Sequence, residues 1–311
     1  MKKTVRNAEV NKGMTIKEQI LNHEGDLIIE NNSLLNFIIE KQTIEKVCLD
    51  NCEMKINHIV SSELKEFFWN KGCVLETVFE KVNLQNCYMK DTLFCGVQFE
   101  NCDFKQEEFD FSAEFSKTIF KDVQMENQGI RYSKFLSCKF NDYISIRGIF
   151  EECEFLDCEM DNVTFKETAM WGKKIDSCTI RNSKLMMASF KGVEIGNCDF
   201  RNCIMDKFDF RKCKFENVIW CGNKHCNLIF ENVKLKNIDM TGSEYQNVIF
   251  RNCEIDSIIV EDGSFRKVKF QNCKMEYIDF TTSNISDVTL EDCDMMDVYF
   301  SDEQCDCYNL L

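Results

Sequence analysis

Large apolar residues recur at every fifth position along the second part of this chain. The series runs from Phe115 to Phe300 with two exceptions in 38 positions, Ser145 and His225. A period of five matches neither the 3.6-residue turn of an α-helix nor the two-residue alternation of a β-strand. A pattern sustained over this length predicts a solenoid, in which the whole chain is one stack of repeated units.

Small or β-branched residues gather two positions before these large residues. One large and one small inward residue in every five fits a chain that turns a corner after each pentapeptide. Four such sides close a coil of twenty residues, and Phe190, Phe210 and Phe230 recur at that larger period. We therefore predict coils that lie directly over one another, with like residues stacked on like residues.

The same repeat occupies the first part of the chain in another phase, from Ile29 to Phe109. The phase slips by one between Phe109 and Phe115, which places one inserted residue near 110–112. One interpretation is a bulge at a corner that re-aims the stack. The alternative is a joint between two rigid blocks, 27–109 and 113–300, that presents Phe111 outward to a partner.

Units such as Asn-Cys-Asp-Phe at 101–104 and at 197–200 resemble those of the pentapeptide-repeat family. The resemblance covers roughly residues 27–300. It implies an all-β fold, a right-handed quadrilateral β-helix solenoid of about 13–14 coils. This chain uses Cys and Val where the commonest family repeat uses Ala, so the small inward residue stays small.

Composition supports one elongated domain over residues 27–300. The chain has no proline in 311 residues. Proline removes a ladder hydrogen bond in any strand that is paired on both sides, so its absence fits continuous pairing from coil to coil.

The two ends of such a stack need covers, because an open sheet edge promotes aggregation. Residues 1–26 are predicted to form an N-terminal cap with a short helix at about 15–23. Thr15 and Glu18 would form its capping box. Residues 301–311 form an acidic C-terminal tail or cap: either a few apolar residues close the last coil, or it meets a second copy. The family resemblance implies that a homodimer forms through the C-terminal coils.

Twenty cysteines occur in a chain whose first residues show no apolar signal segment, which predicts a cytoplasmic location with reduced thiols. Most of them fall in the small inward position, where a thiol is a compact apolar filler. Cys221, His225 and Cys226 bring three metal-ligand types within six residues, but their spacing matches no standard zinc site. We expect no metal or cofactor here, and we expect His225 to face Met205 and Tyr245 in the adjacent coils.

Catalysis finds little support in the sequence. It contains only three histidines, far apart in the predicted stack, and no phosphate-binding glycine loop or nucleophile motif. A filled solenoid interior also leaves no pocket for a small molecule. We therefore expect a protein that is not an enzyme.

The net charge of −15 and pI near 4.8 argue against nucleic acid or an anionic membrane as a partner. Acidic residues gather on the side that carries Met160, Phe200 and Phe280, where they are interrupted by Arg181 and Arg201. One interpretation is a solvated face whose charges prevent association. The acidic residues of this side are Glu159, Asp161, Asp199, Asp239, Glu261, Asp262 and Asp279.

The resemblance adds a functional expectation. Several acidic members of the family imitate a DNA duplex and bind bacterial type II topoisomerases. It implies a non-catalytic binding rod whose partner is DNA gyrase or topoisomerase IV, contacted by the seven acids above and by Phe111. The chain lacks the projecting loops of the quinolone-resistance members, so no loop residue is carried over. The alternatives are a scaffold or immunity-type module with an unrelated protein partner, and a structural repeat protein without a dedicated partner.

Overall fold

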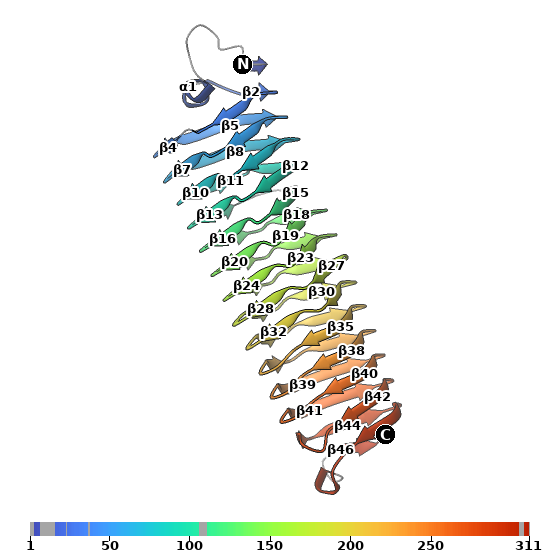
Figure 1. Cartoon of the computed structure of the whole chain (residues 1–311). Coiled ribbons are helices and arrows are strands. Elements are labelled where there is room, and N and C mark those ends of the chain that lie inside the picture. Colours follow the sequence, from blue (N-terminus) through green and yellow to red (C-terminus); the bar gives the residue numbers. More distant parts are fainter. Residues whose placement is uncertain are drawn as a thin grey trace. The chain divides into compact units, whose positions relative to one another are not determined.

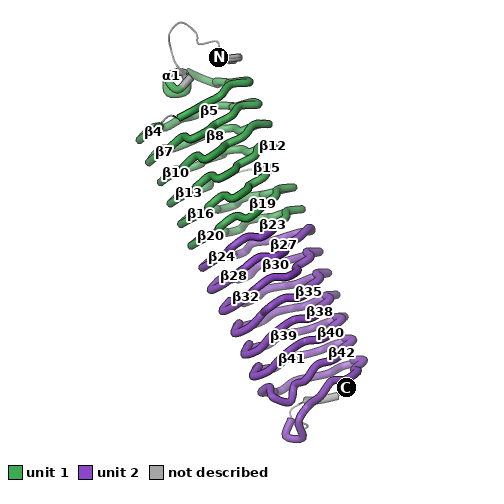
Figure 2. The backbone as a smooth tube through the Cα atoms, viewed as in Figure 1, with its two compact units in different colours: residues 1–154 green, residues 155–311 purple. Residues whose placement is uncertain are grey.

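Two compact units divide the chain in the computed structural model, which describes residues 3–6, 16–22, 24–36, 38–105, 111–304 and 308–310. Unit 1 covers Met1–Glu154 and unit 2 covers Phe155–Leu311 (Figure 2). Within each unit, short strands lie over one another in parallel ladders (Figure 1). The predicted fold class is confirmed as an all-β parallel solenoid of about 13 turns.

Parallel pairing at an offset of twenty residues fixes the coil in both units. In unit 1, β5 (Thr43–Asp50) pairs with β8 (Glu63–Asn70). In unit 2, β30 (Ser189–Lys191) pairs with β34 (Asp209–Arg211), which sets Phe190 opposite Phe210. The rings of the next coils continue this column, with centroids 5.0 Å apart for Phe210 and Phe230. The predicted stacking of like residues is therefore confirmed.

A residue in the left-handed conformation turns the chain at the corners. The φ angle lies near +50° at every fifth residue over long stretches, as at Asn197, Asn202 and Asn217. This conformation costs an L-residue roughly 1–2 kcal/mol, and asparagine tolerates it better than most. Asparagine is the commonest corner residue, and the Asn217 side chain donates a hydrogen bond to that of Asn197 at 3.2 Å. The asparagine columns are thus part of the fold.

Interior cysteines bond to the coil beneath them. Cys253 Sγ donates to the carbonyl of Phe230, and Cys273 Sγ to that of Phe250, each at 3.4 Å. Burial raises the pKa of the Cys102 thiol to about 12, so the thiol keeps the proton that it donates. The sequence predicted only a compact filler, whereas the thiol also satisfies a backbone carbonyl of the preceding coil.

Tyr143 compensates for the first exception to the repeat. Tyr143 holds the small position and Ser145 the central position of the same pentapeptide, and both are buried. Gly148 stands in the next small position, and a Cβ there would lie 2.5 Å from Ser145 Oγ. Large and small residues have exchanged places locally, so the interior volume stays filled.

The phase slip differs in detail from its prediction. Phe111 pairs in register with Met89 in the preceding coil and with Ile130 in the following coil, and both of these partners are buried. The backbone therefore places residue 111 at an interior register position, which differs from the outward position of the alternative interpretation. Phe109, the expected interior residue, lies outside the described residues.

Two changes combine into the net slip of one residue. The stretch from Met89 to Phe111 is two residues longer than a coil, and the stretch from Phe111 to Ile130 is one residue shorter. The shortening falls between Ser112 and Ala113. Their partners in the preceding coil are Lys90 and Thr92, which are separated by the corner residue Asp91, and no residue follows Ser112 to match Asp91. A count of residues alone cannot separate an insertion of one from an insertion of two followed by a deletion.

The N-terminal edge is paired by a strand that the sequence did not indicate. β1 (Lys3–Arg6) runs parallel to β2 (Leu27–Glu30) and covers its free edge. α1 (Ile16–Leu21) is a six-residue helix with Ile20 buried, and it lies against β5. The predicted cap residue Thr15 lies outside the described residues, and the sealing role of this helix stays a prediction. No helix in the described ranges is long and apolar enough to cross a membrane.

The C-terminal segment returns to the last coil. A 3₁₀ turn at Asp302–Gln304 buries Gln304, whose side-chain nitrogen donates to the carbonyls of Phe280 and Ser283 at 2.8 and 2.6 Å. β46 (Tyr308–Leu310) then pairs in parallel with β44 (Val288–Glu291). The segment therefore adds backbone pairing beyond the last repeat.

Ile56 offers a test of the corner rule. It is a β-branched residue with a φ of 55°, and its side chain is about half exposed. Replacement by asparagine should stabilise the protein by about 1 kcal/mol, because the left-handed conformation penalises β-branched residues most. Urea unfolding measures the difference. Glu76→Asn, in the same corner column one coil later, should gain much less, and an equal gain for both variants would contradict the explanation.

The exchange of Tyr143 and Ser145 predicts coupled substitutions. Tyr143→Val alone should destabilise by about 2–5 kcal/mol through a cavity, and Ser145→Phe alone by about 1–3 kcal/mol through overpacking. The double variant restores the usual order of small and large, so its loss should be at least about 1 kcal/mol less than the sum of the single losses. A double-mutant cycle from urea midpoints measures this coupling, and strict additivity would refute the compensation.

Candidate functional site

Six of the eight predicted partner-binding residues lie on one face of unit 2, which we call face A, and a seventh, Asp262, stands at the corner beside it. Face A is formed by residues 159–161 and by the corresponding residues of each later coil, up to 299–301. Outward side chains alternate with the buried central residues along it, because side chains in a strand point to opposite sides. Its strands are β24 (Glu159–Asp161), β28 (Thr179–Arg181), β32 (Asp199–Arg201) and the last residues of β35 (Lys214–Ile219), β38 (Lys234–Asp239), β40 (Glu254–Ile259), β42 (Lys274–Asp279) and β45 (Asp294–Tyr299).

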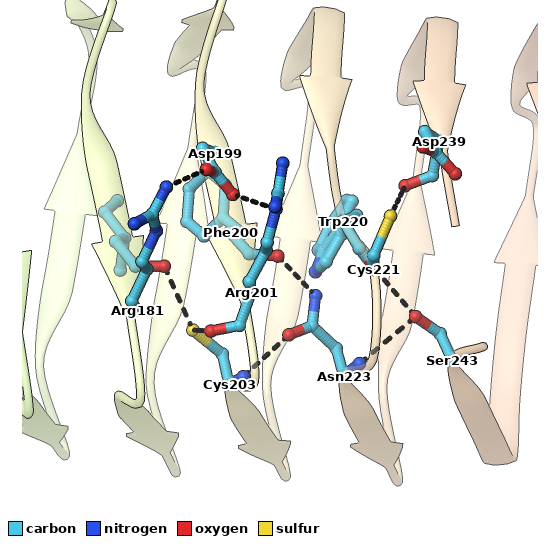
Figure 3. Close-up of polar contacts among 11 residues, drawn as sticks. Arg181, Asp199, Phe200, Arg201, Cys203, Trp220, Cys221, Asn223, Asp239 and Ser243 are labelled. Carbon is cyan, nitrogen blue, oxygen red and sulfur yellow. Dashed lines mark hydrogen bonds and ion pairs between the residues drawn. The ribbon is translucent and has the colours of Figure 1, made fainter. Parts of the chain in front are cut away.

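Ion pairs neutralise the acid at the middle of face A. Asp199 contacts Arg181 at 2.6 Å and Arg201 at 2.9 Å, and its side chain is only 16% exposed (Figure 3). In the same part of the face, Asp161 accepts a hydrogen bond from the Asn182 side chain at 2.7 Å. Two arginines for one carboxylate leave no excess of negative charge around Asp199. The two arginines that the sequence showed as interruptions of the acidic side therefore neutralise the acid at its middle.

Two acids near the C-terminal end of face A hold turns. Asp239 Oδ1 accepts from the backbone and the hydroxyl of Thr241 at 3.1 and 2.6 Å. Burial acts to raise the pKa of Asp239, but the bonds from Thr241 outweigh it and lower that pKa. Asp279 accepts from the Thr281 backbone at 2.8 Å, and the bonds from Thr281 lower the pKa of Asp279. Both carboxylates stay charged, but each also fixes the backbone at its corner.

Glu261 and Asp262 have no such structural partner among the described side chains. Both are exposed, and Asp262 turns the next corner with a φ of 53°. Within the described part of face A and its flanking corners, no lysine or arginine follows Arg201. The excess negative charge of this face is therefore concentrated in its last coils.

An apolar floor accompanies these acids. Ile259, Tyr277 and Tyr299 are 50–56% exposed, which is unusual for large side chains in this solenoid. They line a groove of about 590 Å³ together with Glu261, Asp279 and Asp297. We call these six residues the acid–tyrosine groove.

Sequence reasoning missed the tyrosines and the isoleucine, although a signal was present. Ile259 and Tyr299 occupy the outward position that precedes a central residue. In the same column, this outward position is held by Asp239 and Asp279. Tyr277 stands at a corner with a φ of 55°, where asparagine is the usual residue. Large apolar residues at positions that elsewhere carry polar ones indicate a binding surface.

A ladder of polar side chains supports face A from inside. Asn223 Nδ2 donates to the Phe200 carbonyl at 2.8 Å, and Ser243 Oγ donates to the Trp220 carbonyl at 2.7 Å. The ladder continues through the backbone N–H of Asn223, which donates to Ser243 Oγ (Figure 3). Each donor satisfies a carbonyl of the preceding coil, so the surface strands are held rigidly.

The residues Cys221, His225 and Cys226 do not come together. His225 is fully buried, with Met205 before it and Tyr245 after it in register, as expected, and its ring stacks on that of Tyr245 at 4.5 Å. Cys221 Sγ instead donates to the carbonyl of Asp239 at 3.6 Å (Figure 3). In the part of the chain that the structure describes, no cluster of three or more His, Cys, Asp or Glu residues could hold a metal ion.

His225 predicts acid sensitivity. Burial lowers the pKa of His225 to about 3, whereas an unfolded histidine titrates near 6.5. Since the unfolded chain binds the extra proton, the stability present above pH 6.5 is lost as the pH falls toward 3. Between pH 7.5 and 5 this amounts to about 2 kcal/mol.

Urea unfolding of the wild type and of His225→Phe at both pH values measures this loss. The variant keeps the aromatic stacking but has no group to protonate. Between pH 7.5 and 5, its free energy of unfolding should therefore fall by about 2 kcal/mol less than that of the wild type. An identical pH dependence of the two proteins would contradict the assignment.

Comparison with known proteins identifies the repeat in part of the chain. Residues 225–300 match the family model described as a pentapeptide repeat region. No curated protein matches the sequence.

Among solved structures, the chain is similar to QnrB1, a plasmid-mediated fluoroquinolone resistance protein, with 13% identity and a TM-score of 0.20. That match covers 44% of this chain and 92% of QnrB1. It is also similar to HetL, a pentapeptide repeat protein from the cyanobacterium Nostoc sp. strain PCC 7120, with 10% identity and a TM-score of 0.19 over 88% of this chain and 91% of HetL. The periplasmic alginate epimerase AlgG shows 9% identity and a TM-score of 0.38 over 96% and 83% of the two chains.

Proposed function

We propose that this chain is a non-catalytic module that binds another protein, in keeping with its pentapeptide repeat region over residues 225–300. The observation that carries the proposal is the acid–tyrosine groove on face A. Tyrosine is enriched at protein interfaces, because its ring supplies contact area at a low entropic cost. Acids without neighbouring cations attract a basic surface. We therefore propose a partner that presents lysine or arginine side chains to this groove.

In its most concrete form, the proposal is that this partner is a bacterial type II topoisomerase, either DNA gyrase or topoisomerase IV. Support comes from the resemblance to acidic family members that imitate DNA, and from Glu261, Asp262 and Asp279 near the end of face A. Basic side chains placed for phosphates would meet these carboxylates. The ion pairs around Asp199 restrict the imitation to the last coils, so the footprint is short.

The tyrosines favour a second candidate. A surface that only imitates phosphate charge needs no exposed Ile259, Tyr277 or Tyr299. These side chains instead support a scaffold or immunity-type module that contacts an unrelated basic protein through both charge and apolar area. The free cysteines of the described core fit a reducing compartment, so we place either function in the cytoplasm.

A gyrase supercoiling assay tests the concrete form. The protein should inhibit or shield gyrase at micromolar concentration, and the effect should weaken as salt rises. Glu261→Lys combined with Asp262→Lys should weaken it about tenfold, because neither carboxylate bonds to the turn in which these residues stand. Lys236→Glu, on a neighbouring face, serves as the control and should leave the effect unchanged.

Two outcomes separate the candidates. If neither gyrase nor topoisomerase IV responds in a salt-sensitive manner, the topoisomerase form is wrong. Affinity capture from the native cell, with and without Tyr277→Ser and Tyr299→Ser, then tests the broader proposal. Loss of a basic partner with these variants would support the scaffold function. If all variants retain the same partners, the groove does not bind the partner.

A further inference from the structure

Unit 2 carries a second charged surface on the side opposite face A. Each coil has four faces, and the third of them, which we call face C, is separated from face A by one face on either side. Face C includes β26 (Ala169–Trp171), β30 and β34, which pair in that order. Their last residues form one outward column of Trp171, Lys191 and Arg211.

Positive charge and an exposed aromatic ring gather here. Trp171 is 41% exposed, and Lys173, Lys207 and Lys212 are exposed at the adjacent corners. We call these residues the basic–tryptophan patch: Trp171, Lys173, Lys191, Lys207, Arg211 and Lys212.

Most of this positive charge is not neutralised within the molecule. Among the described residues, Lys191, Lys207 and Lys212 form no ion pair, whereas Arg211 contacts Asp209 at 3.0 Å and Glu231 at 3.8 Å. In a chain of net charge −15, a cationic cluster of this kind is exceptional. Three unpaired lysines beside a tryptophan indicate a surface for an acidic, partly apolar partner.

The geometry of the patch favours a macromolecular surface over a small ligand. The column is a strand face that repeats from coil to coil, and a small molecule would need a concave site. The partner should therefore offer carboxylates and aromatic rings at a matching spacing. The acid–tyrosine groove has this chemistry, and its strands have the same spacing of about 4.8 Å.

We propose that the basic–tryptophan patch of one molecule binds the acid–tyrosine groove of a second copy of this chain. Lysines of the patch meet Glu261 and Asp262, and their ammonium groups also reach the faces of Tyr277 and Tyr299. Two chains of net charge −15 repel each other at long range. At physiological salt the screening length is about 8 Å, so this repulsion is largely screened whereas close ion pairs are less affected.

The contact has a defined symmetry. Because groove and patch are different surfaces on opposite faces, each molecule keeps a free copy of one surface after it binds, and the assembly can extend. Association also covers the groove. The self-association therefore goes beyond the proposed function, and it would compete with a basic partner at high protein concentration.

Sedimentation velocity of the purified protein alone tests this proposal. The mean mass should rise with concentration from micromolar upward and include species larger than dimers. Lys191→Gln with Lys207→Gln should lower the association constant about tenfold, and so should Glu261→Gln with Asp262→Asn. Lys236→Gln is the matched control and should associate like the wild type. Thermal unfolding checks that each variant is folded.

A mixture of the two double variants gives the decisive result. Each variant keeps one intact surface, so one contact can re-form, and native mass spectrometry should detect one-to-one dimers that do not extend. A monomeric wild type at all concentrations would overturn the proposal. A dimer that persists in both double variants, or a mixture that remains monomeric, would also overturn it. These measurements use no partner protein, so they can fail or succeed independently of the gyrase and capture experiments.

Discussion

Backbone hydrogen bonding from each coil to the next is the interaction on which this structure depends. It requires each strand to lie directly over a strand of the preceding coil, which away from the phase slip means an offset of twenty residues and a sharp corner every five residues. The left-handed corner residue meets that requirement at a cost of roughly 1–2 kcal/mol when it is neither glycine nor asparagine. Interior side chains then have only two positions in five, one large and one small. The interior is filled, and function is confined to the outward residues.

The outward charges follow the same geometry. Residues twenty apart are neighbours on one face, so a lysine and a glutamate at that spacing form a pair, as Lys234 and Glu254 do at 2.8 Å. Such exposed pairs contribute little stability. They do remove charge from a face, and Arg181 and Arg201 remove that of Asp199 in the same way. The last coils of face A lack such cations, and the acid–tyrosine groove is the result.

The sequence predicted the fold well because the period of five is a direct consequence of the ladder. It also placed His225 between Met205 and Tyr245, since register follows from counting twenty residues. Counting failed at Phe111, where a longer and a shorter stretch cancel to a net slip of one. It found Arg181 and Arg201 on the acidic side but not that both contact Asp199, because ion pairing depends on which side chains reach across neighbouring coils. The groove was missed because Tyr277 and Tyr299 were not compared with the polar residues usual at their positions.

The burial of Gln304 has a consequence for how the interior bonding pattern survives a break in the repeat. Along one interior column, Cys203, Asn223, Ser243 and Ser283 each donate to the carbonyl of the central residue 23 positions earlier. The next acceptor of that column is the Phe280 carbonyl, and the residue 23 positions after Phe280 is Glu303, which lies in the 3₁₀ turn. Gln304 reaches this carbonyl from the same turn and supplies the donor. One long amide side chain thus takes over the bond that a small interior residue makes elsewhere in the column, and the ladder of carbonyl acceptors stays satisfied where the regular repeat gives way to a turn.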